Sequence, residues 1–245
     1  MTTRRATPFA LACIAALALT ACGGDEEAPA SGAPTVTVTE TAEAAEAPTA
    51  PEQQELTAAQ ISAALPREED MPSGYAEHPD GFDADSTSER SADPESCMAL
   101  YMSTEEMRTF SKEHSTQGEG VRYQRQQQKG YAPSIVVAVW TFDEPYPAKF
   151  FDQAGSALAE CATYDTRFEP EANSVRNAAT AIPTPTVGDQ SFGVRLGDPQ
   201  MDLGVDYLWV RSGHNLINIR MVSGYSQDND TRLGTYTQGV LDALD

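Results

Sequence analysis

Apolar and polar positions divide the chain into a short apolar segment, a polar stretch and a long region of regular periodicity. Phe9 to Leu19 is apolar but too short to cross a bilayer as a helix. Gly23 to Glu55 is almost entirely Gly, Ala, Pro, Thr, Glu and Ser, so it cannot bury enough apolar surface to offset the entropy lost on ordering. We therefore expect one folded domain over residues 56–245, preceded by a flexible acidic linker over residues 22–55.

Three segments of the domain predict strands of a sheet. Ile135 to Phe142 is apolar on both faces, which is typical of a central strand. Gln190 to Leu196 predicts another strand, and Asp206 to Val222 predicts a hairpin with Gly213-His214 as its turn, where glycine supplies a positive φ. That turn sets the pairing, with Leu208 opposite Ile219 and Val210 opposite Ile217 on one face, and Tyr207 opposite Arg220, Trp209 opposite Asn218 and Arg211 opposite Leu216 on the other.

Helical signals surround these strands. Capping boxes at Thr57–Gln60 and Ser103–Glu106 predict the starts of two short helices. Apolar positions at helical spacing predict longer helices over Phe150–Cys161 and over the region from Leu233 to Leu244, while Asp80–Pro94 has the composition of a loop. The predicted fold class is α+β: an antiparallel sheet with two long helices packed on it, preceded by short helices and a disordered N-terminal tether.

Leu19-Thr20-Ala21-Cys22 follows the pattern of a bacterial lipobox at the end of the apolar segment. Arg4 and Arg5 supply the positive region that precedes such a segment in exported proteins. We expect residues 1–21 to be removed as a lipoprotein signal peptide and Cys22 to receive acyl chains such as palmitate. The protein would then be lipid-anchored at the outer face of the cell membrane, exported by either the Sec or the twin-arginine route.

The net charge of -21 narrows the range of partners. Such an acidic chain is repelled by nucleic acid and by anionic lipid headgroups. Attachment to the membrane therefore has to come from lipid on Cys22.

Two of the four cysteines, Cys97 and Cys161, lie in the predicted folded domain. In an oxidising compartment we expect them to form a disulfide. Two buried free thiols are the alternative, and a zinc pair is less favoured because no histidine lies at ligand spacing.

Catalytic and metal-binding patterns are missing from the sequence. His78, His114 and His214 lie in predicted loops, a helix end and a turn, without a nucleophile motif such as Gly-x-Ser-x-Gly. The acidic residues between Asp80 and Glu89 lack the glycine and the terminal glutamate of a calcium-binding loop. We expect no enzymatic activity, no cofactor and no bound metal.

One face of the predicted hairpin groups two cations with two large aromatic side chains, in a chain with few basic residues. Such a face suits sugars, peptidoglycan fragments or carboxylates. The alternative is that these side chains stabilise each other across the strands. The candidate ligand-binding residues are Tyr207, Trp209, Arg211, Asn218 and Arg220.

Several motifs together resemble actinobacterial surface lipoproteins with a domain related to the extracellular sensor domain of PknH-type kinases. The motifs are the lipobox, the acidic spacer, Leu56–Gln60 leading into Asp70–Tyr75, the strand into Phe142 with the helix ending at Cys161, Val187–Ser191, and Val210 to Ile219. The resemblance implies an α+β sensor or ligand-binding module without known enzymatic activity. Together with the mixed face of the hairpin, it leads us to expect a sensor-like module that binds a small or cell-wall ligand. The alternative is a non-catalytic scaffold that binds an envelope protein.

Overall fold

The structure is a computed structural model that describes residues 50–83, 90–125, 132–168 and 171–245. The expected signal peptide, Cys22 and most of the linker lie outside the described residues. No helix in the described part of the chain is both long and apolar enough to cross a membrane.

Within the described residues, nine strands form one antiparallel sheet in the order β1-β3-β4-β9-β8-β7-β6-β5-β2. Neighbours along the chain are mostly neighbours in the sheet, but β2 lies at the opposite edge from β1. The strands are β1 (Tyr75–Glu77), β2 (Arg90–Asp93), β3 (Ser115–Arg125), β4 (Ser134–Phe142), β5 (Thr163–Phe168), β6 (Glu171–Ala181), β7 (Gln190–Asp198), β8 (Leu203–Ser212) and β9 (Asn215–Ser223).

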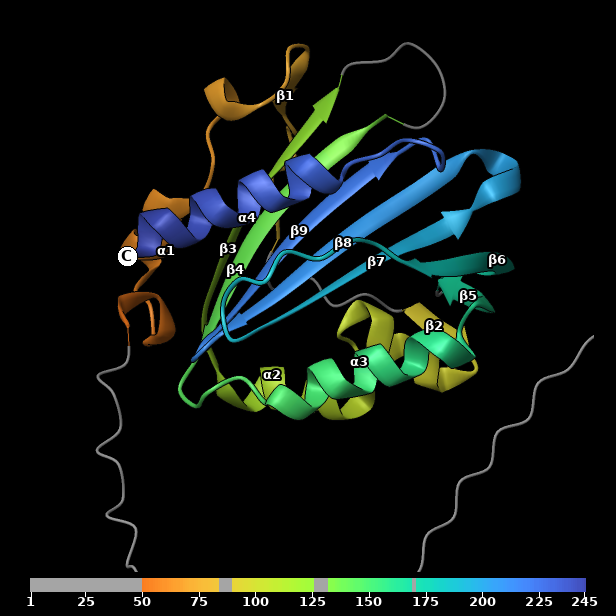
Figure 1. The fold of residues 1–245 in the computed structure, drawn as a ribbon, viewed down its shortest axis with the longest axis horizontal. Coiled ribbons are helices and arrows are strands. Elements are labelled where there is room, and N and C mark those ends of the chain that lie inside the picture. The colour runs from red at the N-terminus through yellow and green to blue at the C-terminus, as the bar shows by residue number, and fades with distance from the viewer. Residues whose placement is uncertain (1–49, 84–89, 126–131, 169–170) are drawn as a thin grey trace, which may run out of the picture. The chain divides into compact units, whose positions relative to one another are not determined.

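Helices cover both faces of this sheet (Figure 1). On one face lie α1 and α4, and on the other lie α2, α3 and the 3₁₀ helix η3. The helices are η1 (Pro51–Gln53), α1 (Ala58–Ala64), η2 (Glu68–Asp70), η3 (Glu95–Tyr101), α2 (Glu105–His114), α3 (Ala148–Glu160), η4 (Pro199–Met201) and α4 (Asp230–Leu244).

Alternation along the central strands supplies one apolar layer to each side. Leu208 and Ile217 pack with Leu233 of α4 on one face. Tyr207 and Trp209, the neighbours of Leu208 in sequence, pack on the other face in the core that includes α3 and η3. Successive side chains of a strand point to opposite faces, so β8 contributes to both cores.

The predicted fold class is confirmed. All five predicted cross-strand pairs of the hairpin occur in the structure, around a turn in which Gly213 has a φ of +52°. The two predicted long helices are α3 and α4, and they pack on opposite faces of the sheet. The turn and the period-two alternation were therefore sufficient to set the register.

Some local predictions were wrong. Asp80–Pro94 was expected to be a loop, but its last part forms β2, which pairs with β5. The second short helix begins one residue later than its predicted capping box, because Thr104 and not Ser103 accepts the hydrogen bond from the Met107 amide. Strand β3 was not predicted, since its sequence is rich in glycine and polar residues and lacks apolar alternation.

Residues just before Leu56, in the segment expected to be the end of the linker, contact the hairpin. The Asn215 side-chain amide donates to the carbonyl oxygens of Glu52 and Gln54, each at 2.8 Å. Gly213 lies so close to this segment that a Cβ atom there would be 2.1 Å from the Gln53 carbonyl oxygen. The end of the tether is thus held against the turn between β8 and β9.

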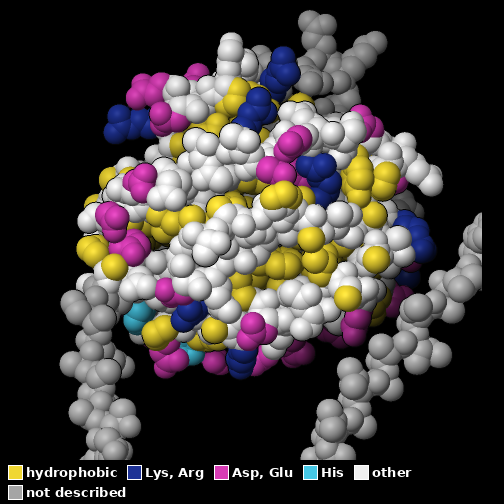
Figure 2. Space-filling view, in the orientation of Figure 1, with side chains coloured by type: hydrophobic (Ala, Val, Ile, Leu, Met, Phe, Trp, Pro, Cys, Tyr) yellow, Lys and Arg dark blue, Asp and Glu magenta, His cyan; other side chains and the backbone are white. Residues whose placement is uncertain are grey.

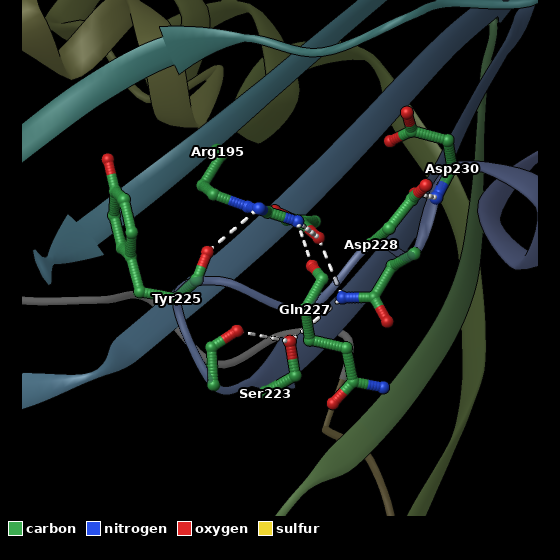
Figure 3. A network of polar contacts seen from close by, with 9 residues as sticks. Arg195, Ser223, Tyr225, Gln227, Asp228 and Asp230 are labelled. Atoms are coloured by element: carbon green, nitrogen blue, oxygen red, sulfur yellow. Dashed lines mark hydrogen bonds and ion pairs between the residues drawn. The ribbon is translucent and has the colours of Figure 1, made fainter.

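A buried polar network joins the sheet to the start of α4 (Figure 3). Arg195 of β7 forms a two-pronged ion pair with Asp206 of β8, with N···O distances of 2.6 and 2.7 Å. The Asn229 side-chain amide donates to Asp206 and to Ser223, each at 2.8 Å. Because Asn229 immediately precedes α4, this network fixes where the helix leaves the sheet.

Candidate functional site

The structure places the five predicted ligand-binding residues on one face of the sheet, the face toward α3 and η3. Tyr207 and Trp209 project from β8 and are only 6% and 7% exposed. Asn218 and Arg220 project from β9 as their cross-strand partners, and Asn218 is buried. Tyr207, Trp209, Asn218 and Arg220 therefore form one continuous patch.

Arg211 lies on the same face but near the turn of the hairpin, where it holds a neighbouring loop. Its Nε atom donates to the Tyr146 carbonyl oxygen at 2.5 Å, and its Nη1 atom lies 3.1 Å from an Asp189 carboxylate oxygen. Asp189 also accepts a hydrogen bond from the Gly213 amide. Arg211 therefore has a structural role, because its contacts hold the neighbouring loop against the hairpin turn.

Aromatic rings make up the centre of the patch. The rings of Tyr207 and Trp209 are stacked, with centroids 6.1 Å apart and planes at 5°. Trp140 of β4 lies 6.4 Å from Trp209, and Tyr101 of η3 packs edge-on against Tyr207 at 5.8 Å. The Tyr101 and Tyr164 hydroxyl groups are 2.6 Å apart. Three phenols thus meet beside the two indoles.

The disulfide positions part of this aromatic group. Cys97 in η3 is bonded to Cys161 at the end of α3, and both residues are fully buried. Tyr101 is the last residue of η3, and Tyr164 follows Cys161 by three residues in β5. The covalent bond therefore holds the two segments that bring these phenols together.

Two arginines that the sequence analysis did not select join the patch. The Arg90 guanidinium of β2 lies over the Tyr101 ring at 4.1 Å and over the Phe168 ring at 4.6 Å. Arg122 of β3 stands on the same face as Arg220, because both are cross-strand partners of Val136. Arg90 belongs to the segment expected to be a loop and Arg122 to the strand that was not predicted, so no signal in the sequence pointed to either.

The charges around Tyr207 change its acidity. Burial raises the pKa of its phenol, but the neighbouring Arg220 and Arg90 guanidinium groups more than offset that effect, and the net shift is downward. Burial raises the pKa of Tyr101 to about 12 and also raises the pKa of Tyr164. The patch thus favours negative charge at Tyr207 and disfavours it at the two phenols beyond.

Several hydrogen-bond donors in the patch are buried without a partner among the described residues. They are the indole N–H of Trp209 and the Nε atoms of Arg90, Arg122 and Arg220. An unpaired buried donor is costly, and native structures contain few of them. Guanidinium and indole N–H groups are donors only, so the arrangement suits hydrogen bonding to an acceptor.

The three histidines of the chain, which the sequence places in a loop, at a helix end and in a turn, lie outside the patch and contact other residues. His114 Nδ1 lies 2.9 Å from an Asp143 carboxylate oxygen, and His214 Nδ1 lies 2.9 Å from the Phe142 carbonyl oxygen. His78 forms a longer pair with Asp80 at 3.8 Å.

A separate open groove of about 700 Å³ lies between α2 and α3. Its rim carries Glu95, Glu105 and Glu113, and its Lys149 is already paired with Glu106. On the face seen in Figure 2, acidic and basic side chains both lie in small separate groups among uncharged atoms. The groove is thus bordered mainly by acidic side chains, whereas the patch around Tyr207 concentrates positive charge.

No protein-family profile and no curated protein matches the sequence. Among solved structures, the extracellular domain of PknH from Mycobacterium tuberculosis superposes with a TM-score of 0.61 at 13% identity, covering 78% of this chain and 98% of that domain. An uncharacterised protein from Mycobacterium smegmatis gives a TM-score of 0.35 at 11% identity, covering 76% of this chain and 95% of that one. The described chain therefore shares the fold of the PknH extracellular domain.

Proposed function

We propose that this protein is a lipid-anchored extracytoplasmic module that binds a small or cell-wall ligand on the sheet face around Trp209. In this proposal residues 1–21 are a signal peptide, Cys22 carries the lipid, residues 22–55 are the tether and the α+β domain is non-catalytic. The lipobox supports the anchor. The fold shared with an extracellular domain supports the location.

The observation that carries the ligand proposal is the buried, unpartnered indole N–H of Trp209 beside stacked aromatic rings. Aromatic platforms with a few unpaired donors are typical of small-molecule sites, because the rings bury ligand surface and the donors fix its orientation. The second candidate is a scaffold that binds an envelope protein. The small exposed fraction of Trp209, 7%, favours that alternative because it leaves little of the indole accessible.

Two measurements test this function. Replacing Cys22 by Ser is expected to release the protein from membranes, and retention of that variant through a carbonate wash would contradict the anchor. In the full-length wild-type protein in a non-ionic detergent, tryptophan fluorescence is expected to change with added muropeptides. No change with muropeptides, together with failure of aqueous quenchers to reach Trp209, would favour the scaffold.

A further inference from the structure

Three arginines from distant parts of the chain lie on the candidate face. Arg122 and Arg220 flank Val136 in one row across β3, β4 and β9, so their Cα atoms are two strand spacings apart, about 10 Å. Tyr207 is the next residue in this row, as the partner of Arg220. Arg90 reaches the same phenol from β2. Tyr207 therefore lies between two guanidinium groups, with a third farther along the row.

These three arginines lack a carboxylate partner among the described residues, in a protein with 37 acidic residues. The described ion pairs of arginine involve Arg67, Arg195 and Arg211 instead. The Nε atom of each of the three is buried and unpaired. Arg90 and Arg220 each hydrogen-bond the Tyr207 phenol, which supplies part of the acceptor capacity that they need. The three unpaired Nε donors remain, and a buried donor without an acceptor is unfavourable, so this face favours a negatively charged acceptor.

The chemistry of the free donors identifies the kind of group that would meet this requirement. Guanidinium and indole N–H groups donate hydrogen bonds and cannot accept them. Their complement is an acceptor with negative charge and several oxygen atoms, and arginine forks match phosphate and carboxylate groups in this way. The surrounding acidic chain opposes non-specific binding of anions, which makes a localised cationic site selective.

We propose that Arg90, Arg122 and Arg220 bind the oxyanion group, phosphate or carboxylate, of a small ligand held on the aromatic face. This inference rests on the proposed function, and it adds the chemical class of the ligand and two residues from β2 and β3. The Trp209 N–H supplies a further donor on the same face.

Arginine–aromatic packing alone explains only part of the arrangement. Arg90 stacks on Tyr101 and Phe168, and a structural role accounts for that contact. Arg122 has no side-chain hydrogen bond, ion pair or ring contact within the described residues, and its Nε atom is buried. A purely structural arginine would be expected to have such contacts, so Arg122 is the residue that separates the two explanations.

The test measures melting temperature and affinity for the full-length protein in non-ionic detergent at constant ionic strength. The probes are inorganic phosphate, N-acetylmuramyl dipeptide as a carboxylate-bearing wall fragment, and a neutral N-acetylglucosamine disaccharide. The variants are Arg122→Gln and Arg220→Gln. Arg176→Gln, at an exposed position on β6, is the matched control.

We expect at least one anion to raise the melting temperature saturably, as binding to the folded state requires. Arg122→Gln and Arg220→Gln should each lower the affinity for that anion by about tenfold or more, which is the usual effect of losing a charged hydrogen bond. Arg176→Gln should leave that affinity unchanged. A response to phosphate alone identifies phosphate as the bound group, and a response to the dipeptide alone identifies a wall carboxylate. Without anion, Arg122→Gln should melt no lower than the wild type.

Other results would overturn the oxyanion site. One such result is that neither anion raises the melting temperature saturably. The other is that both arginine variants bind the anion as tightly as the wild type, whether or not Arg122→Gln melts at a lower temperature. Stabilisation by the neutral disaccharide but by neither anion would leave the proposed ligand-binding function in place and remove only the oxyanion.

Discussion

The buried pair between Arg195 and Asp206 is expected to be one of the most sensitive positions in the domain. The Asp206 side chain is 1% exposed and the Arg195 side chain 16%. Asp206→Asn keeps the shape of the side chain but removes its charge, and it turns one oxygen that accepts hydrogen bonds into an amide group that donates them. That amide would face either Arg195 or Asn229, both of which also donate.

The loss of unfolding free energy in Asp206→Asn depends on the hydrogen bonds that Arg195 retains. Removing one member of a buried ion pair costs roughly 3–5 kcal/mol. Arg195 would still donate to the carbonyl oxygens of Tyr225 and Gln227, at 2.8 and 2.6 Å, and its partial exposure lets water compensate. The lower end of the range therefore applies, and Asp206→Asn should lower the free energy of unfolding by about 3 kcal/mol.

Urea unfolding followed by circular dichroism would measure this loss as a lower midpoint at an unchanged slope. Glu106→Gln is the control, because it breaks the exposed pair with Lys149 and should not change the midpoint measurably. A double-mutant cycle with Arg195→Ala and Asp206→Ala would then isolate the pair itself. If Asp206→Asn behaves like the control, the network of Figure 3 does not hold α4 in place.

Two further predictions concern the disulfide and the tyrosines. Replacing both Cys97 and Cys161 by Ala should lower the free energy of unfolding by about 4 kcal/mol, because the disulfide closes a loop between residues 64 apart and so restricts the unfolded chain. A urea midpoint equal to that of the wild type would contradict this. The folded state raises the pKa of Tyr101 to about 12, against 10 when the chain is unfolded. The contribution of the neutral phenol to the free energy of unfolding should therefore be fully present below pH 10 and decline between pH 10 and 12. A urea midpoint that stays constant across that window would refute this. In ultraviolet titration, Tyr207 should ionise below pH 10, and Tyr207→Phe should remove that first step.

The sequence predicted those parts of the fold in which local chemistry and pattern agree. Gly213 supplies the turn, and the alternating residues on either side supply the register, so the β8–β9 hairpin is specified almost entirely by nearby residues. The helices α3 and α4 likewise have continuous apolar stripes that end in buried contacts. These elements need no information from distant segments to be recognised.

Strand β3 illustrates the opposite case. Its residues between Gly118 and Arg122 alternate poorly, and what holds the strand in the sheet is its long pairing with β4. Gly120 is small because the Phe82 ring lies over it, where a Cβ atom would come within 2.5 Å of a ring carbon. The requirement for glycine at this position comes from a segment 38 residues earlier in the chain, and single-sequence patterning contains no trace of it.

The candidate site combines both situations, which explains why one of its three arginines was found from the sequence and two were not. Tyr207 and Arg220 were found because they face each other across a hairpin whose register is local. Arg90 enters from the opposite edge of the sheet, and Arg122 from a strand without apolar alternation. A site of this kind is assembled by topology. Its positive charge could be recognised only once the strand order had brought three arginines of an acidic chain to one face.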